Sequence, residues 1–178
     1  MNEAEIAHSS GVNGTYWWKV VEASLLALGV VKDLLISHQK KNPLPLDVVA
    51  ILQSSVDQHS RMAASPFLLG RCLWTASRFA GILPEGLLNR YLQATVAALQ
   101  LHQEIILRIT AVRAIWGFCE HLKSQRNTTV LTPMLPVITD SLLNLAITFS
   151  NEVLSLVLET LAMVLAVSNL PYLLLNNE

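Results

Sequence analysis

A short sequence recurs along this chain at a regular interval. Arg113-Ala114-Ile115-Trp116 is echoed by Arg71-Cys72-Leu73-Trp74, which lies 42 residues earlier. The second copy sits in the stretch from Leu107 to Cys119, whose apolar residues follow helical spacing. A period of about 40–47 residues is typical of HEAT and armadillo arrays, in which each unit contains a pair of helices. The recurrence therefore constrains the chain to an all-α fold of stacked helix pairs.

The same recurrence reaches both ends of the chain. Glu22 and Glu159 occupy the places that Arg71 and Arg113 hold in the two central units. We expect a HEAT-repeat α-solenoid of about seven helices, with antiparallel pairs stacked in a right-handed superhelix. The expected domain organisation is a disordered lead or loop at 1–14, followed by three to four repeats at 15–178. The expected helices lie near 16–39, 47–59, 66–81, 85–101, 104–123, 130–149 and 152–167.

Several local signals set these boundaries. Gly29 inside the first long helix predicts close packing or a kink. Ser65-Pro66 predicts a helix start, with serine as N-cap and proline at the first helical position. Pro133 and Pro136 predict either a kink in the sixth helix or a delay of its first full turn.

The chain is strongly apolar, with 52% hydrophobic and only 14% charged residues. An ordinary globular domain has roughly 25% charged residues, so these helices are expected either to be buried on more than one side or to enter a membrane. The best candidate for a spanning segment, Val153 to Leu175, is interrupted by Glu159, Asn169 and Pro171. Because the N-terminus is polar and acidic, we expect no secretory signal. A stacked array is the preferred interpretation, and a small membrane-associated helical protein stays as an alternative.

No pattern in the sequence indicates catalysis or a cofactor. The chain has no Gly-rich phosphate loop, nucleophile elbow or Cys-x-x-Cys pair, so we expect no enzyme activity, no catalytic residue and no cofactor. Cys72 and Cys119 are expected to be small buried residues in a reducing compartment. The net charge of −1 with no basic stripe argues against direct nucleic-acid binding. The histidines lack the spacing of metal ligands; they are His8, His38, His59, His102 and His121.

Four segments, in order and in register, resemble one known family. The first runs from Trp17 to Gly29, with Glu22-Ala23 followed by an apolar run that ends Ala27-Leu28-Gly29. The others are Ser65 to Phe79, Leu92 to Val96, and Ala111 to Gly117. Together they cover about Tyr16 to Val167 and look like inner helices of the importin-β (karyopherin-β) family of nuclear transport receptors.

The resemblance implies a helical superhelix that carries cargo through nuclear pores and moves between cytoplasm and nucleus. Its implied partners are basic cargo proteins, such as core histones, together with Ran GTPase and nuclear pore proteins through the full-length receptor. The family's Ran-binding repeats lie mainly nearer the receptor's N-terminus, so no Ran contact is placed on a residue here. A HEAT-repeat structural adaptor unrelated to transport is the alternative function.

Two kinds of residue on the expected inner helices are candidates for partner binding. The carboxylates Glu22, Glu120 and Glu159 would attract a basic cargo if they line a concave surface. The competing interpretation is that Glu22 and Glu159 form a ladder of ion pairs with Arg71 and Arg113, because an unpaired charge at a packed position is costly. The tryptophans are expected mainly to fill gaps between repeats, although Trp17 or Trp18 could leave one ring exposed.

Overall fold

The computed structural model describes residues 17–39, 46–58, 62–63, 65–126, 129–149 and 151–168, and within them every regular element is a helix. The α-helices are α2 (Trp17–Val30), α3 (Lys32–Gln39), α4 (Val48–Asp57), α6 (Pro66–Arg78), α7 (Glu85–Ala98), α8 (Ile105–Gln125), α9 (Leu135–Thr148) and α10 (Asn151–Ser168). Two short 3-10 helices, η1 (Ala80–Ile82) and η2 (Thr132–Met134), precede α7 and α9. The predicted lead at 1–14 lies outside the described residues.

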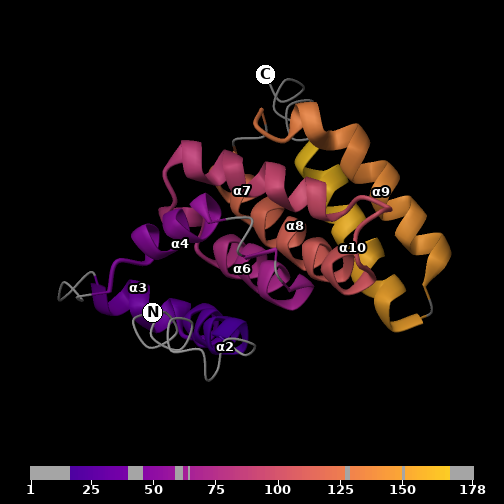
Figure 1. Ribbon diagram of the computed structural model, residues 1–178. Coiled ribbons are helices and arrows are strands. Elements are labelled where there is room, and N and C mark those ends of the chain that lie inside the picture. The colour runs from indigo at the N-terminus through magenta and orange to yellow at the C-terminus, as the bar shows by residue number, and fades with distance from the viewer. Residues whose placement is uncertain are drawn as a thin grey trace, which may run out of the picture.

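The helices form two layers, as expected for a HEAT-repeat solenoid (Figure 1). In one layer α6 packs between α2 and α8, and α8 packs in turn against α10. In the other layer α4 contacts α6 and α7, α7 contacts α8, and α9 contacts α10. Each unit is thus a helix pair, α4 with α6, α7 with α8 and α9 with α10. We call α2, α3, α6, α8 and α10 the inner helices.

The centre of the array is α8, the helix that carries the second Arg-x-x-Trp sequence. Its apolar stripe is inaccessible to solvent: Ala111, Ala114, Ile115 and Phe118 are 0% exposed and Leu107 is 4% exposed. The helix has neighbours on several sides, because α6, α7 and α10 all pack against it. This position explains the low charge content of the chain, since a helix surrounded by others has little surface left for charged side chains.

The single helix expected at 16–39 is interrupted at Val31, between the end of α2 and the start of α3. Helical hydrogen bonds continue on both sides, from Val31 N–H to the Ala27 carbonyl and from Leu35 N–H to the Val31 carbonyl, each at 3.0 Å. Gly29 lies two residues before the break, where α2 approaches the indole of Trp74. A Cβ added at Gly29 would clash with this ring, with Trp74 Cη2 at 2.9 Å and Cζ3 nearer still. Gly29 therefore marks the close packing contact that the sequence offered as one of two alternatives, and the interruption of the helix lies two residues further on.

The starts of the helices follow local sequence signals. The Asp47 side chain accepts a hydrogen bond from the Ala50 N–H at 3.0 Å and so caps α4. Ser65 is the N-cap residue of α6 and Pro66 follows it in the first turn, as predicted, although the serine side chain makes no capping hydrogen bond. At the sixth expected helix the delay occurs, because Pro133 lies in η2 and Pro136 in the first turn of α9.

Helix α7 ends at Ala98, before the expected end at Leu101. The Leu99 carbonyl just beyond it accepts a hydrogen bond from Arg108 Nε at 3.2 Å. Arg108 comes from α8 and is only 5% exposed. A cation at a helix C-terminus interacts favourably with the free carbonyls there, so Arg108 fastens the end of α7 to the start of α8.

A buried tyrosine connects the two layers. The Tyr91 hydroxyl on α7 donates to the Leu52 carbonyl on α4 at 2.9 Å, and it lies 3.4 Å from Cys72 Sγ on α6. Burial raises the pKa of the Cys72 thiol to about 11 and that of Cys119 to about 12, and both thiols are free. The two cysteines therefore act as small core residues.

Candidate partner-binding surface

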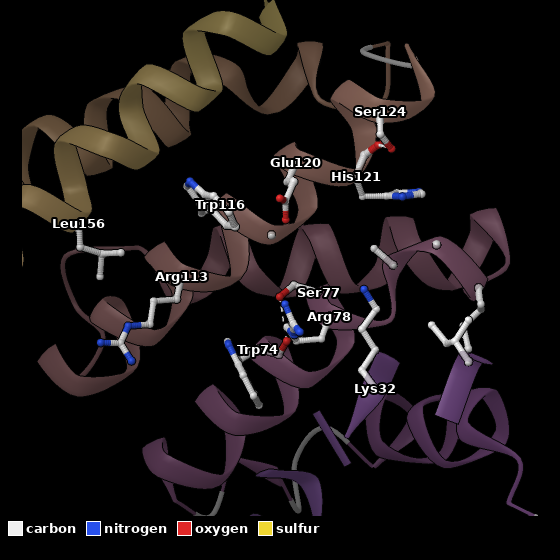
Figure 2. Close-up of a pocket in the computed structure, with 15 residues that line it drawn as sticks. Lys32, Trp74, Ser77, Arg78, Arg113, Trp116, Glu120, His121, Ser124 and Leu156 are labelled. Carbon is white, nitrogen blue, oxygen red and sulfur yellow. Dashed lines mark hydrogen bonds between the residues drawn. The ribbon is translucent and has the colours of Figure 1, made fainter. Parts of the chain in front are cut away.

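The inner helices enclose a hollow of about 790 Å³ (Figure 2). We call it the inner hollow. It is lined mainly by α3, α6 and α8, with η1 on one side and Leu156 of α10 at one edge. The lining residues are Lys32, Ile36, Trp74, Ser77, Arg78, Ala80, Gly81, Ile82, Arg113, Trp116, Gly117, Glu120, His121, Ser124 and Leu156.

Basic side chains outnumber acidic ones around the inner hollow. Lys32, Arg78 and Arg113 line it, and Glu120 is the one carboxylate among the lining residues. Arg78 Nη2 is 3.9 Å from Asp33 Oδ2, and the Asp33 side chain is 80% exposed, so this ion pair is loose and solvated. Lys32 also lies near Asp33, at 3.5 Å. The local charge is therefore positive, although the whole chain carries a net charge of −1.

Two tryptophans from the repeated Arg-x-x-Trp sequence line the same hollow. Trp74 comes from α6 and Trp116 from α8, and both are partly exposed. The Arg71 guanidinium carbon lies 5.2 Å from the Trp74 ring centroid, a cation–π contact that holds this indole in place. The α2 backbone at Gly29 supports its far edge. The recurrence in sequence thus becomes a recurrence in space, with one partly exposed indole on each of two adjacent inner helices.

Of the three predicted cargo-binding carboxylates, Glu22 is already engaged within the chain. Arg71 Nε donates to Glu22 Oε1 at 2.6 Å, and the two side chains are 29% and 23% exposed, respectively. This is the first rung of the predicted ion-pair ladder. The second rung, Arg113 with Glu159, does not form.

The other two carboxylates are exposed. Glu120 makes no ion pair with any described residue, and in Figure 2 its carboxylate points from α8 into the inner hollow. Glu159 on α10 accepts a hydrogen bond from Ser155 Oγ of its own helix at 3.0 Å. A role of Glu22, Glu120 or Glu159 in cargo binding stays a prediction. The structure brings Glu120 alone into the hollow.

Trp17 and Trp18 differ in exposure, as expected for adjacent residues that point in different directions from a helix. Trp17 is 9% exposed and belongs to the core, whereas Trp18 is partly exposed. The Trp18 ring stacks on Phe67, with centroids 6.4 Å apart and planes 18° apart, and Lys19 Nζ lies 5.6 Å from its centroid. Trp18 is not among the residues that line the inner hollow, and its ring is covered in part by Phe67 and Lys19.

His121 is the one lining residue of the inner hollow with a resolved change in pKa. Partial burial lowers the pKa of His121 below its ordinary value of 6.5, and the positive charge of Lys32 lowers it further. Near neutral pH the imidazole is therefore neutral and can both donate and accept a hydrogen bond.

Sequence reasoning did not identify Lys32 and Arg78 as site residues. A signal was present, because the Arg-x-x-Trp repeat predicted that Trp74 and Trp116 occupy equivalent places. The sequence did not indicate which cations lie near these tryptophans, because Lys32 belongs to α3, which begins after the interruption at Val31. Helical spacing in one sequence does not predict the direction of a helix after a break.

Two further features bear on the class of protein. In the part of the chain that the structure describes, no three His, Cys, Asp or Glu side chains gather closely enough to hold a metal ion. Within the same residues no helix has the length and apolar character required to span a membrane.

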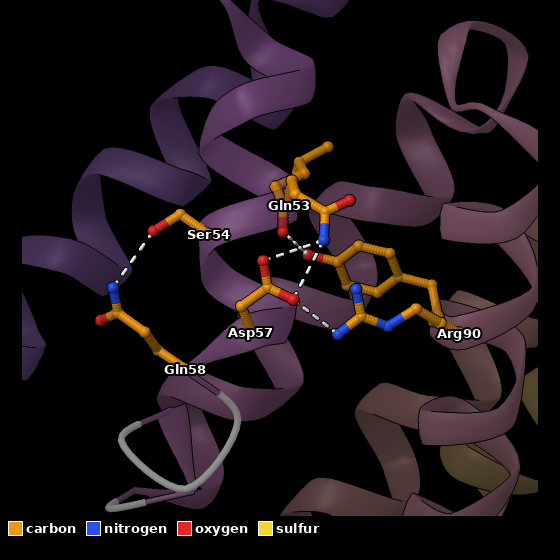
Figure 3. Close-up of polar contacts among 7 residues, drawn as sticks. Gln53, Ser54, Asp57, Gln58 and Arg90 are labelled. Atoms are coloured by element: carbon orange, nitrogen blue, oxygen red, sulfur yellow. Dashed lines mark hydrogen bonds and ion pairs between the residues drawn. The ribbon is translucent and has the colours of Figure 1, made fainter.

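A second network of polar contacts lies away from the inner hollow, between α4 and α7 (Figure 3). We call α4, α7 and α9 the outer helices. Gln53 Nε2 donates to both oxygens of the Asp57 carboxylate, at 3.0 and 2.9 Å, and Arg90 Nη2 donates to Asp57 Oδ1 at 2.7 Å. The hydrogen bond from Gln53 and then that from Arg90 hold the pKa of Asp57 below its usual value. This exposed network connects α4 with α7 and lies outside the inner hollow.

Comparison with known proteins finds a similarity to one importin. No protein-family model matches the chain. Over 154 residues, which is 84% of this chain, the sequence is 29% identical to importin-9 of Drosophila melanogaster. The matched region is 14% of the length of that relative. The chain is thus similar to one short segment of an importin, the group that the residues from Trp17 to Gly117 resemble.

Proposed function

We propose that this chain is a segment of an importin-9-like nuclear transport receptor and serves as a scaffold for cargo. In this proposal the full-length receptor imports basic proteins such as core histones, releases them to Ran-GTP, and moves between cytoplasm and nucleus past nuclear pore proteins. The observation that carries the proposal is the similarity to importin-9, which covers 84% of this chain.

The distribution of carboxylates supports a particular place for a basic cargo. Glu120 on α8 and Glu159 on α10 are exposed and free of ion pairs with described residues, whereas Glu22 is held by Arg71. Exposed carboxylates on one face of an array attract a basic protein and speed its encounter, and salt weakens this attraction. Cargo binding is therefore proposed for the side of the array that carries α8 and α10.

The test measures binding of the chain to a fluorescently labelled core histone dimer at low and at physiological salt. The double variant Glu120→Gln/Glu159→Gln is expected to bind about tenfold more weakly at low salt, because it removes two of the interacting charges. Glu85→Gln is the matched control, since Glu85 is an exposed carboxylate in the first turn of the outer helix α7. Equal binding by all three proteins would contradict the proposed cargo surface.

Sensitivity to Ran-GTP separates a transport receptor from a HEAT-repeat adaptor, the alternative function. The measurement uses the longer receptor that contains this segment, loaded with the labelled histone dimer. Release on addition of Ran-GTP, but not Ran-GDP, is the expected result. A complex that persists with both nucleotides would favour the adaptor.

A further inference from the structure

We propose that the inner hollow binds an acidic peptide segment of a partner protein, in extended form, with a large apolar side chain of that peptide against Trp74 or Trp116. This proposal does not depend on a role in nuclear transport, because a HEAT-repeat adaptor could use the same surface. It also assigns to the inner hollow a ligand of opposite charge to the basic cargo proposed for the exposed carboxylates.

Positive charge gathers around the inner hollow. Lys32, Arg78 and Arg113 approach the hollow from three different helices, α3, α6 and α8. Arg113 forms no ion pair with any described residue, and Lys32 and Arg78 share one solvated carboxylate, Asp33, at 3.5 and 3.9 Å. Cations that gather without tight internal partners leave a positive potential, which attracts carboxylates.

The repeated tryptophans lie on two adjacent inner helices. Trp74 on α6 recurs as Trp116 on α8, and both indoles line the hollow. Of the two repeated arginines, Arg113 lines the hollow, whereas Arg71 is held by Glu22. Packed helices lie about 8–10 Å apart, and an extended chain advances about 3.3 Å per residue. One step of the array therefore matches about three residues of an extended peptide. A ligand with apolar residues repeated at that spacing would meet an indole on each of these two helices, and its acidic residues would lie among Lys32, Arg78 and Arg113.

The exposure of the basic side chains indicates which kind of anion fits the hollow. A site for a small anion usually surrounds it with buried donors, whereas the side chains of Lys32 and Arg78 are 27% and 37% exposed. Long, partly exposed basic side chains around an open hollow suit a peptide that lies across it. Nucleic acid would need a longer basic stripe than this chain has.

A change at Glu120 distinguishes binding of an acidic peptide from binding of the basic cargo. Its carboxylate points into the hollow and repels an acidic ligand. We expect Glu120→Gln to bind an acidic peptide several-fold more tightly and the histone dimer more weakly, because removing one negative charge acts in opposite directions on the two ligands. A change in the same direction for both ligands would overturn the assignment of the hollow to the acidic one.

The probe is a fluorescein-labelled synthetic peptide of twelve residues that repeats Phe-Asp-Glu, measured by fluorescence anisotropy with the full chain. Arg113→Glu is expected to weaken its binding about tenfold or more, since it reverses one charge in the hollow. Lys123→Glu is the matched control, because Lys123 is exposed on the same helix α8 and does not line the hollow. The control is expected to bind within about twofold of the unmodified chain.

Three further measurements complete the test, one with a variant and two with other ligands. Circular dichroism first shows that each variant is helical. Trp116→Ala is expected to weaken binding about tenfold, because it removes an apolar contact surface. A peptide with lysine in place of each acidic residue is expected to bind far more weakly. Equal binding by Arg113→Glu and Lys123→Glu, or by the acidic and basic peptides, would overturn the proposal. Tighter binding of a single-stranded oligonucleotide of equal charge would replace the peptide with nucleic acid as the ligand.

Discussion

The junction of α2 with α6 and the junction of α8 with α10 use equivalent repeat positions in different ways. At the first, Glu22 pairs with Arg71 at 2.6 Å and the Thr75 hydroxyl lies 3.0 Å from the Leu25 carbonyl. At the second, Arg113 and Glu159 form no ion pair. The first junction is thus joined by polar contacts between helices, whereas the charges at the second remain available to solvent and to a partner.

This difference teaches that a repeated position in sequence does not ensure a repeated contact. Opposite charges at equivalent places are not sufficient for an ion pair, because Arg113 of α8 and Glu159 of α10 have opposite charges and do not pair. Arg71 pairs with the carboxylate at the equivalent position of α2, Glu22. Arg113 is therefore free to serve the inner hollow. The following predictions test this contrast, in order of decreasing effect.

The largest effect is expected from filling the close contact between α2 and α6. Gly29→Val places a branched side chain where Trp74 lies, and we expect a loss of about 2–3 kcal/mol in the free energy of unfolding from overpacking. Urea denaturation measures this loss. Gly86→Val is the matched control, since a Cβ at Gly86 in α7 meets nothing within 4 Å. Comparable losses in the two variants would show that helix α2 does not depend on the Trp74 contact.

A smaller loss of unfolding free energy is expected from removing the buried hydroxyl of Thr75 than from Gly29→Val. The Thr75 hydroxyl lies 2.8 Å from the Arg71 carbonyl of its own helix and 3.0 Å from the Leu25 carbonyl of α2, so its one proton is shared between them. Thr75→Val removes this connection to α2, and we expect a loss of about 1 kcal/mol in unfolding free energy. Thr160 on α10 is equally buried, but its hydroxyl bonds only to the Leu156 carbonyl of its own helix, at 2.8 Å. Thr160→Val should cost clearly less in the same urea titration. The reverse order would contradict a polar connection between α2 and α6.

Double-mutant cycles compare the two candidate rungs of the ion-pair ladder directly. For Glu22→Gln with Arg71→Gln we expect a coupling energy of about 0.5–1 kcal/mol, since the pair is partly exposed. For Arg113→Gln with Glu159→Gln we expect a value near zero. The measurement is the unfolding free energy of each single and double variant. A coupling of similar size at both places would mean that the second ion pair forms in solution.

The smallest effect concerns pH. Because the pKa of His121 is lowered in the folded chain, the unfolded chain binds more protons in the range between that pKa and about 6.5. The contribution of His121 to stability is therefore complete above about pH 6.5 and decreases as the pH falls through the folded pKa. We expect His121→Gln to lose less stability than the unmodified chain between about pH 7.5 and pH 5.5. An identical pH dependence of urea denaturation in both proteins would contradict the lowered pKa.

Particular residues show how far the sequence alone could be interpreted. The stripe from Leu107 to Phe118 is buried as its spacing predicted, because helical periodicity follows directly from the order of apolar residues. The break after Gly29 and the start of α9 beyond Pro133 also have local causes, a missing side chain and a fixed backbone angle. The inner hollow was not predicted, because it combines residues from α3, α6 and α8 that are far apart in the chain.

The sequence by itself therefore determined the class of fold, the recurring helix pairs and the equivalence of Trp74 with Trp116. These properties depend on the period of apolar residues and on proline and glycine, which act within one or two helical turns. Only the tertiary structure decided which charges meet. It assigned Arg71 to Glu22, left Arg113 without such a partner among the described residues, and brought Lys32 beside Arg78. Ion pairs and hollows depend on the distances between side chains of different helices, and those distances are set by how the helices pack.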